Sequence, residues 1–259
     1  MRVVRGVRVA VAAGLGYLAG TLPSSDLACR LATGGATDLR AVGSRNPGAN
    51  NAGKYLGKRW GYGVMAADMA KGALGCAAGR MAAGATGAQV GGVATVVGHC
   101  YPVWTGFRGG KGVAASVGQC AATFPLWSVP DLLVAWAAAE VPRRRAAAHG
   151  GFWFGDPGDP RWWRRRHVRA TVVSSCLWVA AATLWWRRGW PNLWGPRPSA
   201  ALPLGAAATS AVILFRLVTE PPPLTPHSPD EPPRPDGGDR EPLAPVPFVP
   251  TLEAEMSPA

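Results

Sequence analysis

Residues 98–116 read GHCYPVWTGFRGGKGVAAS and join two apolar segments. Three glycines, an arginine and a lysine stand at the centre of this stretch: Arg108, Gly109, Gly110, Lys111 and Gly112. Glycine permits positive φ angles, which allow successive backbone N–H groups to face one anion. A basic loop that leads into a helix N-terminus is suited to phosphate binding. A tight basic turn between two membrane helices is an equally good interpretation of this loop by itself. The loop is not a Walker A motif, because Gly112 follows the lysine where Ser or Thr is required.

The composition of the chain changes sharply near residue 220. The 259 residues include 48% hydrophobic residues, yet the mean hydropathy is only +0.06. Residues 1–219 alternate apolar segments with short basic loops, whereas residues 220–259 are rich in proline and acidic residues. A segment with so little apolar surface cannot offset its conformational entropy. We therefore expect a membrane domain over residues 1–219 and a disordered Pro/acidic tail over residues 220–259.

Seven apolar segments favour an all-α, polytopic membrane protein. They are roughly Val7–Leu31, Trp60–Ala78, Ala88–Trp104, Val113–Phe124, Leu126–Val141, Val168–Trp186 and Ala201–Val218. A membrane helix needs about 20 apolar residues, so the short fourth and fifth segments are either two tilted spans or one re-entrant element. The first segment, with its arginines, also resembles a signal peptide, but the later apolar segments favour a membrane helix.

The distribution of positive charge favours two separate spans over one re-entrant element. The formal net charge is +12. With two spans, most of the Lys and Arg lie on one side, in loops 34–59, 106–111 and 142–167. The positive-inside rule places these loops in the cytoplasm, with the N-terminus outside and the C-terminus inside, although the N-terminal arginines oppose this topology. Glycine, proline and aspartate oppose a helix through the Trp/Arg-rich insertion 146–166, which we expect to be cytoplasmic and interfacial. No basic face of a soluble domain indicates a nucleic-acid partner.

The cysteines and histidines give no signature of a metal site or of a disulfide framework. The five cysteines are scattered through apolar segments, and the four histidines do not cluster. We therefore predict no metal and no cofactor.

A second polar cluster, TDLRAVGSRNPGANNAGKYLGKRWG, covers residues 37–61. Its short hydrogen-bonding and basic side chains suit an anionic ligand that carries hydroxyl groups: Asp38, Arg40, Ser44, Arg45, Asn46, Asn50, Asn51 and Lys54. An ordinary loop rich in turn-forming residues is the alternative. Further along, Asp68 and Lys71 share a helix face inside an apolar segment, where charges must pair or face a polar cavity. His99 at a segment end is more typical of a structural histidine than of a base.

Seven short motifs occur in the order GTLPSSD, DLR, GSRNPGANN, GKRWG, DMAKG, GHCYP and FRGGKGVAAS, between Gly20 and Ser116. This order resembles the bacterial membrane glycerol-3-phosphate acyltransferases of the PlsY type. The resemblance implies seven membrane helices in the bacterial inner membrane with a cytoplasmic active site. It also implies transfer of an acyl group from acyl phosphate to the 1-hydroxyl of glycerol 3-phosphate, giving lysophosphatidic acid for phospholipid synthesis.

The resemblance also implies roles for individual residues. Arg40, Ser44 and Lys111 would be catalytic. Substrate-binding or bracing positions would be Asn46, Asn51, Lys54, Asp68, Lys71, His99, Arg108, Gly109, Gly110 and Gly112. Arg45 departs from the pattern, since it stands where the family has glycine.

The third motif of the family, H-R-x-N-I-x-R-L, is incomplete in this chain. The last apolar segment ends AVILFRLVTEPPP. One alignment places Leu217 and Glu220 at the histidine and asparagine positions, and the other places Ser210 and Ile213 there. Two alternatives to the enzyme therefore stay open: a catalytically weakened paralogue that binds a phosphate ligand or partner, and a small membrane transporter.

Overall fold

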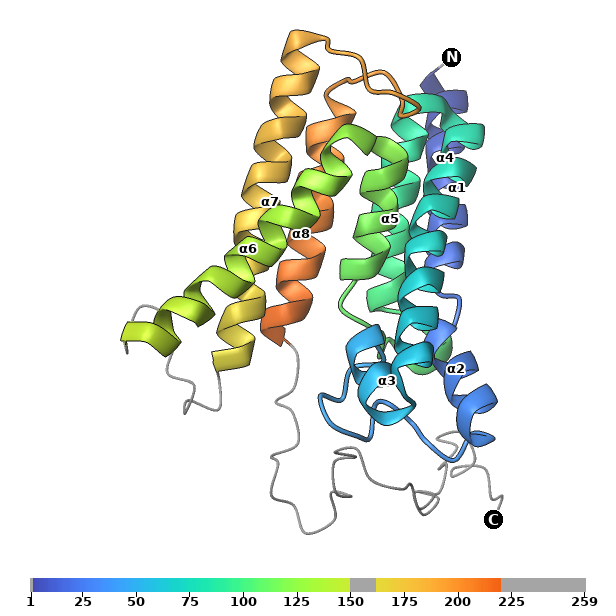
Figure 1. Cartoon of the computed structure of the whole chain (residues 1–259). Helices are drawn as coiled ribbons and strands as arrows, with labels where there is room; N and C mark the ends of the chain where they lie inside the picture. The colour runs from blue at the N-terminus through green and yellow to red at the C-terminus, as the bar shows by residue number, and fades with distance from the viewer. Residues whose placement is uncertain (1, 150–161, 220–259) are drawn as a thin grey trace, which may run out of the picture. The chain divides into compact units, whose positions relative to one another are not determined.

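The computed structural model describes residues 2–149 and 162–219, and its ordered elements are all helical (Figure 1). They are α1 (Arg2–Gly20), α2 (Ser24–Thr33), α3 (Ala49–Tyr55), α4 (Lys58–Cys100), the 3₁₀ turn η1 (Val103–Thr105), α5 (Val113–Thr123), α6 (Pro125–His149), α7 (Trp162–Arg188) and α8 (Ala201–Thr219). No strand occurs in the described ranges, so the all-α prediction is confirmed. The predicted tail and residues 150–161 of the insertion lie outside the described residues.

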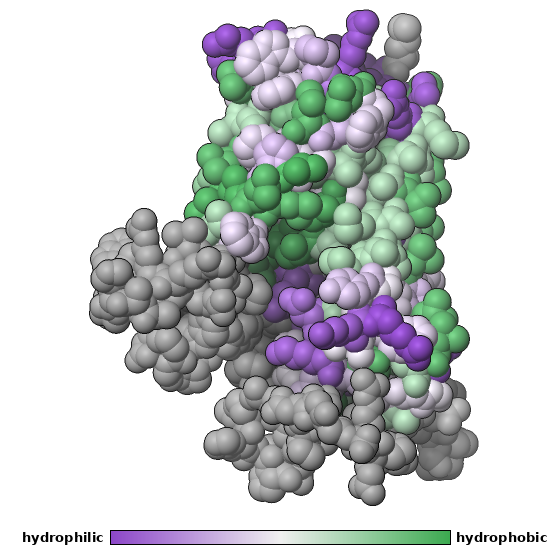
Figure 2. Space-filling model, in the orientation of Figure 1, coloured by the Kyte–Doolittle hydropathy of each residue, from purple (hydrophilic) through white to green (hydrophobic). Residues whose placement is uncertain are grey.

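Three stretches are long and apolar enough to cross a membrane, as judged by length and composition: Arg2–Thr33, Val168–Arg188 and Ala201–Thr219. Apolar side chains also lie exposed on the outer faces of the helices, such as Val7, Val11 and Leu15 on α1 and Leu133 on α6. Figure 2 shows a broad apolar surface over the helices. An apolar exterior of this kind is expected of a protein that faces lipid. The number of seven spans stays a prediction.

The chain divides into two compact units, each considered by itself. The larger unit contains residues 1–22 and 66–220, and the smaller unit contains residues 23–65 and 221–259. In the described part of the smaller unit, α2 and α3 enclose a small core around Cys29, Leu39, Ala52 and Val64. In the larger unit, α5, α7 and α8 share a core that includes Phe124 and Trp178.

The first apolar segment was expected to form one helix over Val7–Leu31, and this prediction is wrong. Helix α1 ends at Gly20, and α2 begins at Ser24 after Pro23. Proline lacks the backbone N–H that an uninterrupted helix requires, and it disfavours the helical conformation of the residue before it. The loop expected over 142–167 is also shorter than predicted, since α6 continues to His149 and α7 begins at Trp162. Alanine and arginine near these ends have high helix propensity.

The second and third apolar segments form the two arms of α4, which are separated by a sharp break. Ala83 has φ −140° and Gly84 has φ 64° and ψ −146°, so neither residue is helical. The conformation of Gly84 is one that residues with a Cβ rarely adopt. The third segment was expected to reach Trp104, but the second arm ends at Cys100 and a 3₁₀ turn follows.

Glycines allow the helices of the larger unit to approach at backbone distance. A Cβ on Gly79 would collide with the Gly87 carbonyl, and a Cβ on Gly91 would collide with the Gly75 carbonyl, so the α4 arms are antiparallel. A Cβ on Gly16 of α1 would collide with the backbone of Gly91. The hydroxyl of Thr95 lies 2.8 Å from the Gly91 carbonyl and 3.0 Å from the Gly16 carbonyl. Small residues are the usual means of close helix packing in membranes, where lipid provides no hydrophobic driving force.

We predict that Gly16→Ala lowers the stability of the protein by about 1–3 kcal/mol, because the added methyl group overpacks the α1–α4 contact. Thermal unfolding of the purified chain in detergent measures the effect. Gly14→Ala in the same helix is the matched control, since a Cβ there meets nothing within 4 Å. Equal unfolding midpoints for the two variants would contradict the proposed close contact.

Candidate active site

The glycine loop of the larger unit folds back onto the end of α4. The Gly109 amide donates to the Cys100 carbonyl at 3.1 Å, and the Gly110 amide donates to the His99 carbonyl at 3.0 Å. A Cβ on Gly109 would collide with the His99 carbonyl, and one on Gly110 would collide with Nε2 of the His99 ring. Close packing therefore requires glycine at both positions.

The same hydrogen bonds change which backbone N–H groups are available to donate to a phosphate. The amides of Gly109 and Gly110 point to α4 carbonyls, so they do not form the cradle that the sequence indicated. Gly112, with φ 84°, is the N-cap residue of α5. The first amides of a helix have no partner within that helix and carry its positive dipole end. The start of α5 and the half-buried Lys111 are therefore the part of the loop whose donors suit an anion.

Arg216 near the end of α8 holds the carbonyl side of the same loop. Its Nη2 donates to the Gly109 carbonyl at 3.0 Å, and its Nε lies 3.3 Å from the Gly110 carbonyl. The guanidinium also lies over the Tyr101 ring, 5.9 Å from the ring centre. Arg216 is absent from the site predicted from sequence. The available signal was a lone arginine near the end of the last apolar segment, in the remnant of the third motif.

Asp68, Lys71 and His99 form a buried polar group behind the loop. Lys71 Nζ lies 2.8 Å from Asp68 Oδ1, and His99 Nδ1 lies 3.5 Å from the same oxygen. Lys71 also donates to the Leu22 carbonyl at 3.2 Å. The three residues are at most 7% exposed. Because Nε2 of His99 lies against Gly110, this group supports the loop from inside the bundle.

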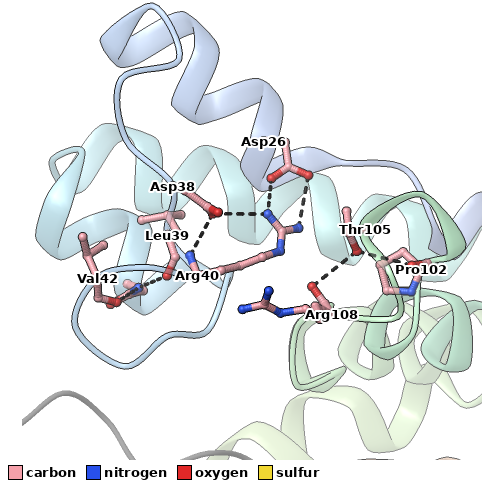
Figure 3. A network of polar contacts seen from close by, with 9 residues as sticks. Asp26, Asp38, Leu39, Arg40, Val42, Pro102, Thr105 and Arg108 are labelled. Carbon is pink, nitrogen blue, oxygen red and sulfur yellow. Dashed lines mark hydrogen bonds and ion pairs between the residues drawn. The ribbon is translucent and has the colours of Figure 1, made fainter. Parts of the chain in front are cut away.

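Arg108 precedes the glycines and is exposed. Its carbonyl lies 3.4 Å from the hydroxyl of Thr105, and the same hydroxyl lies 3.3 Å from the Pro102 carbonyl. These contacts, drawn in Figure 3, shape the turn that leads into the loop.

Arg40 in the smaller unit is held by two carboxylates, as Figure 3 shows. Its guanidinium contacts both oxygens of Asp26, at 2.5 and 3.2 Å, and Asp38 at 3.4 Å. Burial by itself would lower the pKa of Arg40, but the hydrogen bonds and charges of Asp26 and Asp38 outweigh it, and the pKa is raised. A two-pronged carboxylate contact also fixes the plane of the guanidinium.

Asn51 organises the loop that carries Ser44. Its amide nitrogen donates to the carbonyls of Leu39 and Val42 at 2.9 and 3.0 Å, and its oxygen accepts from the Ser44 amide at 3.3 Å. The side chain is 2% exposed. Its role here is therefore to shape the loop.

The remaining predicted residues of the smaller unit lie on the same loop or on α3. Arg45 has φ 58°, a left-handed conformation that favours glycine, which is the residue that the sequence resemblance implies at this position. Asn46 is half-buried beside Gly48, and Lys54 is exposed on α3. The smaller unit thus joins Asn51 to the loop that carries Arg40 and Ser44, whereas the larger unit brings together the glycine loop, Asp68, Lys71 and His99.

Removal of the Arg216 clamp is expected to loosen the glycine loop. In Arg216→Gln, we expect amide hydrogen exchange across residues 108–113 to become about 10-fold faster or more, because two carbonyls lose a charged donor. Arg169→Gln is the control, since Arg169 also donates to a carbonyl, that of Ala138 at 3.4 Å, but away from the loop. Unchanged exchange in Arg216→Gln would show that the clamp does not restrain the loop.

Asn51→Asp is expected to destabilise the protein by at least about 2 kcal/mol at neutral pH, because a buried carboxylate would replace a donor that faces two carbonyls. Thermal unfolding measures the loss. The neighbouring Asn50→Asp is the control, because Asn50 is exposed. The prediction fails if both variants unfold at the same temperature.

Comparison with known proteins identifies relatives over the first part of the chain. The family model described as glycerol-3-phosphate acyltransferase matches residues 10–150, which is more than half of the chain. Glycerol-3-phosphate acyltransferase 4 of Dehalococcoides mccartyi is 44% identical over 108 residues, covering 40% of this chain and 56% of that protein. Glycerol-3-phosphate acyltransferase of an Anaeromyxobacter species is 41% identical over 129 residues, covering 48% and 63%. The chain thus matches less than two thirds of the length of these relatives.

Two solved structures share the fold over most of the chain. The crystal structure of PlsY, an integral membrane glycerol 3-phosphate acyltransferase, in its glycerol 3-phosphate form has 26% identity and a TM-score of 0.56, with 79% of this chain and 87% of that chain covered. The lysophosphatidic acid form has 23% identity and a TM-score of 0.51 and supports the fold only. By the match over residues 10–150, this chain belongs to the glycerol-3-phosphate acyltransferase family of the PlsY type.

Proposed function

We propose that this chain transfers a fatty acyl group from acyl phosphate to the 1-hydroxyl of glycerol 3-phosphate. The product is lysophosphatidic acid, a precursor of membrane phospholipids. Family membership supports this proposal, as does the name of the related PlsY structure, which is a glycerol 3-phosphate form.

The observation that carries the proposal is the construction of the glycine loop. Its backbone is held by α4 on the amide side and by Arg216 on the carbonyl side, directly before the N-terminus of α5. A rigid loop before a helix N-terminus, with a lysine in it, suits a phosphomonoester. We therefore assign phosphate binding to Arg108, Lys111 and the α5 N-terminus that begins after Gly112, and support of the loop to Gly109, Gly110, Asp68, Lys71 and His99.

The chemistry requires no protein nucleophile and no cofactor. The substrate hydroxyl oxygen forms a bond with the acyl carbonyl carbon, the bond from that carbon to the phosphate oxygen breaks, and the hydroxyl proton passes to the departing phosphate. Alignment of the two substrates supplies much of the rate, since effective molarities can reach about 10⁵ M or more. We assign stabilisation of developing negative charge to Arg40, Ser44 and Lys111. Asn46, Asn51 and Lys54 shape or line the Ser44 loop.

We further propose that the chain spans the bacterial inner membrane seven times. In this topology the N-terminus lies outside, and the glycine loop and the Ser44 loop face the cytoplasm. The excess of Lys and Arg in loops 34–59 and 106–111 and around residues 142–167 supports this orientation.

A catalytically weakened paralogue is the second candidate, and the third motif supports it. Ile213 belongs to an apolar cluster with Val96, Cys100 and Leu217, and its side chain lies beside Gly112. Ser210 is 6% exposed. In one alignment with the family, the hydrocarbon side chain of Ile213 thus stands at the asparagine position. The small hydroxyl side chain of Ser210 stands at the histidine position.

Lys111→Ala is expected to lower kcat/KM by on the order of 100-fold, because a cationic donor to the phosphate and to developing charge is removed. The assay follows labelled glycerol 3-phosphate into lysophosphatidic acid with the full chain in vesicles and acyl phosphate as donor. The same assay with acyl-coenzyme A in place of acyl phosphate tests which of the two compounds the protein uses as acyl donor. Ser44→Ala tests the smaller unit in the same way.

Lys58→Ala is the matched control, because Lys58 is an exposed lysine at the start of α4 and outside the assigned site. Wild-type turnover in Lys111→Ala and Ser44→Ala would overturn the assignment of these residues. Binding of glycerol 3-phosphate by the wild type without turnover would favour the weakened paralogue. Uptake of substrate into sealed vesicles without acylation would favour a transporter.

A further inference from the structure

One end of the larger unit carries positive charge for which the proposed function gives no role. This end comprises the start of α1, the break in α4, the α5–α6 junction and the connection from α7 to α8 (Figure 1). Hydrogen bonds join these parts: Arg8 Nε to the Ala82 carbonyl at 2.6 Å, Arg80 Nη1 to the Trp194 carbonyl at 3.2 Å and Trp194 Nε1 to the Ala121 carbonyl at 2.9 Å.

This end lies far from the glycine loop. Along the second arm of α4, Gly84 at the break and Cys100 beside the loop are separated by 16 residues. At 1.5 Å per residue the separation is about 24 Å, which is close to the thickness of a hydrocarbon core. A surface at this end is therefore distinct from the candidate active site.

Seven exposed arginines form what we call the arginine collar: Arg2, Arg5, Arg8, Arg80, Arg187, Arg188 and Arg197. The described segments that form this end of the larger unit provide no carboxylate to neutralise them. Residues 2–25, 69–130 and 162–219 contain neither Asp nor Glu. The carboxylate closest in sequence to Arg80 is Asp68, which is buried and paired with Lys71. The collar is thus a concentrated positive surface.

Tryptophans stand among the arginines of the α7–α8 connection. Arg187 lies over the Trp186 ring at 6.0 Å, and Arg188 lies over the Trp190 ring at 5.7 Å. Trp194 is 67% exposed, and the adjacent Leu193 is 62% exposed. Tryptophan is enriched where membrane hydrocarbon meets headgroups, because its ring is apolar and its N–H is polar.

We propose that the arginine collar binds the headgroups of anionic phospholipids. Arginine matches a phosphate with several donors in one plane, and the neighbouring Trp194 and Leu193 place the charges at the level of the headgroups. The exposed apolar residues favour a lipid surface over a soluble polyanion, which would offer them no apolar contact.

The test measures which lipids the purified full chain retains in two kinds of nanodisc. One kind contains equal parts of phosphatidylcholine and phosphatidylglycerol, and the other contains phosphatidylcholine alone. Native mass spectrometry counts the phosphatidylglycerol molecules that stay bound. Each basic residue near an anionic surface contributes roughly a five-fold change in affinity. The triple variant R187Q/R188Q/R197Q should therefore bind phosphatidylglycerol on the order of 100-fold more weakly. Arg8 and Arg80 are left intact, because both donate to backbone carbonyls.

R187K/R188K/R197K is the matched control, because it keeps the charge and should retain most of the bound phosphatidylglycerol. Equal retention by the wild type and the Gln triple variant would overturn the proposal, as would equal loss in both triple variants. Tighter binding of a single-stranded oligonucleotide than of phosphatidylglycerol by the wild type would also overturn it.

If the Gln triple variant does not fold, two other measurements still test whether the collar binds anionic lipid. Wild-type retention of phosphatidylglycerol should fall as salt is raised, because the Debye length shortens, whereas retention of phosphatidylcholine should not. The single variant R197Q changes only the connection and should weaken phosphatidylglycerol binding about five-fold. Salt-independent retention with no effect of R197Q would contradict a charged lipid site.

Discussion

Close contact between helix backbones at glycine is the constraint on which the larger unit depends. Gly75 faces Gly91, and Gly79 faces Gly87, so the register of the two α4 arms is fixed to within a residue. Two turns further along, this register places Asp68 opposite His99, and the ring of His99 then lies against Gly110. The geometry of the glycine loop therefore originates in contacts that lie about 12 Å deeper in the bundle, at 1.5 Å per residue. Larger side chains at these glycines would separate the arms and remove the support of the loop.

The two polar loops are stabilised in a similar way, although they belong to different units. In each, a buried or half-buried side chain satisfies backbone carbonyls: Arg216 for the glycine loop and Asn51 for the loop of Ser44. Each unit also holds a basic residue in an ion pair: Lys71 with Asp68 in the larger unit and Arg40 with Asp26 in the smaller unit. Both loops are thus ordered by the protein itself, which is the arrangement that electrostatic catalysis requires, since little reorganisation accompanies the reaction.

Sequence patterns were sufficient for the helical class and for most helix positions, whereas the roles of the residues in both loops stay predictions. The patterns were insufficient where local and long-range interactions compete. Pro23 interrupts an apolar run that hydrophobicity alone reads as one helix. The amides of Gly109 and Gly110 were expected to bind an anion, but the folded chain uses them to join α4, a contact that composition cannot reveal. Arg216 was visible as a lone arginine, yet its partners stand more than 100 residues earlier in the chain.

That separation has a consequence for the order of events during synthesis. The carbonyl of Gly110 and the side chain of Arg216 are 106 residues apart. At about 5–20 residues per second, a ribosome needs roughly 5–20 s to make the intervening chain. Helix α4 is complete before this interval and α5 is made early in it, while the glycine loop still lacks its clamp. The glycine loop is thus completed last, when α8 has been made, and a nascent chain stalled before α8 carries every residue of the matched family segment without a finished loop.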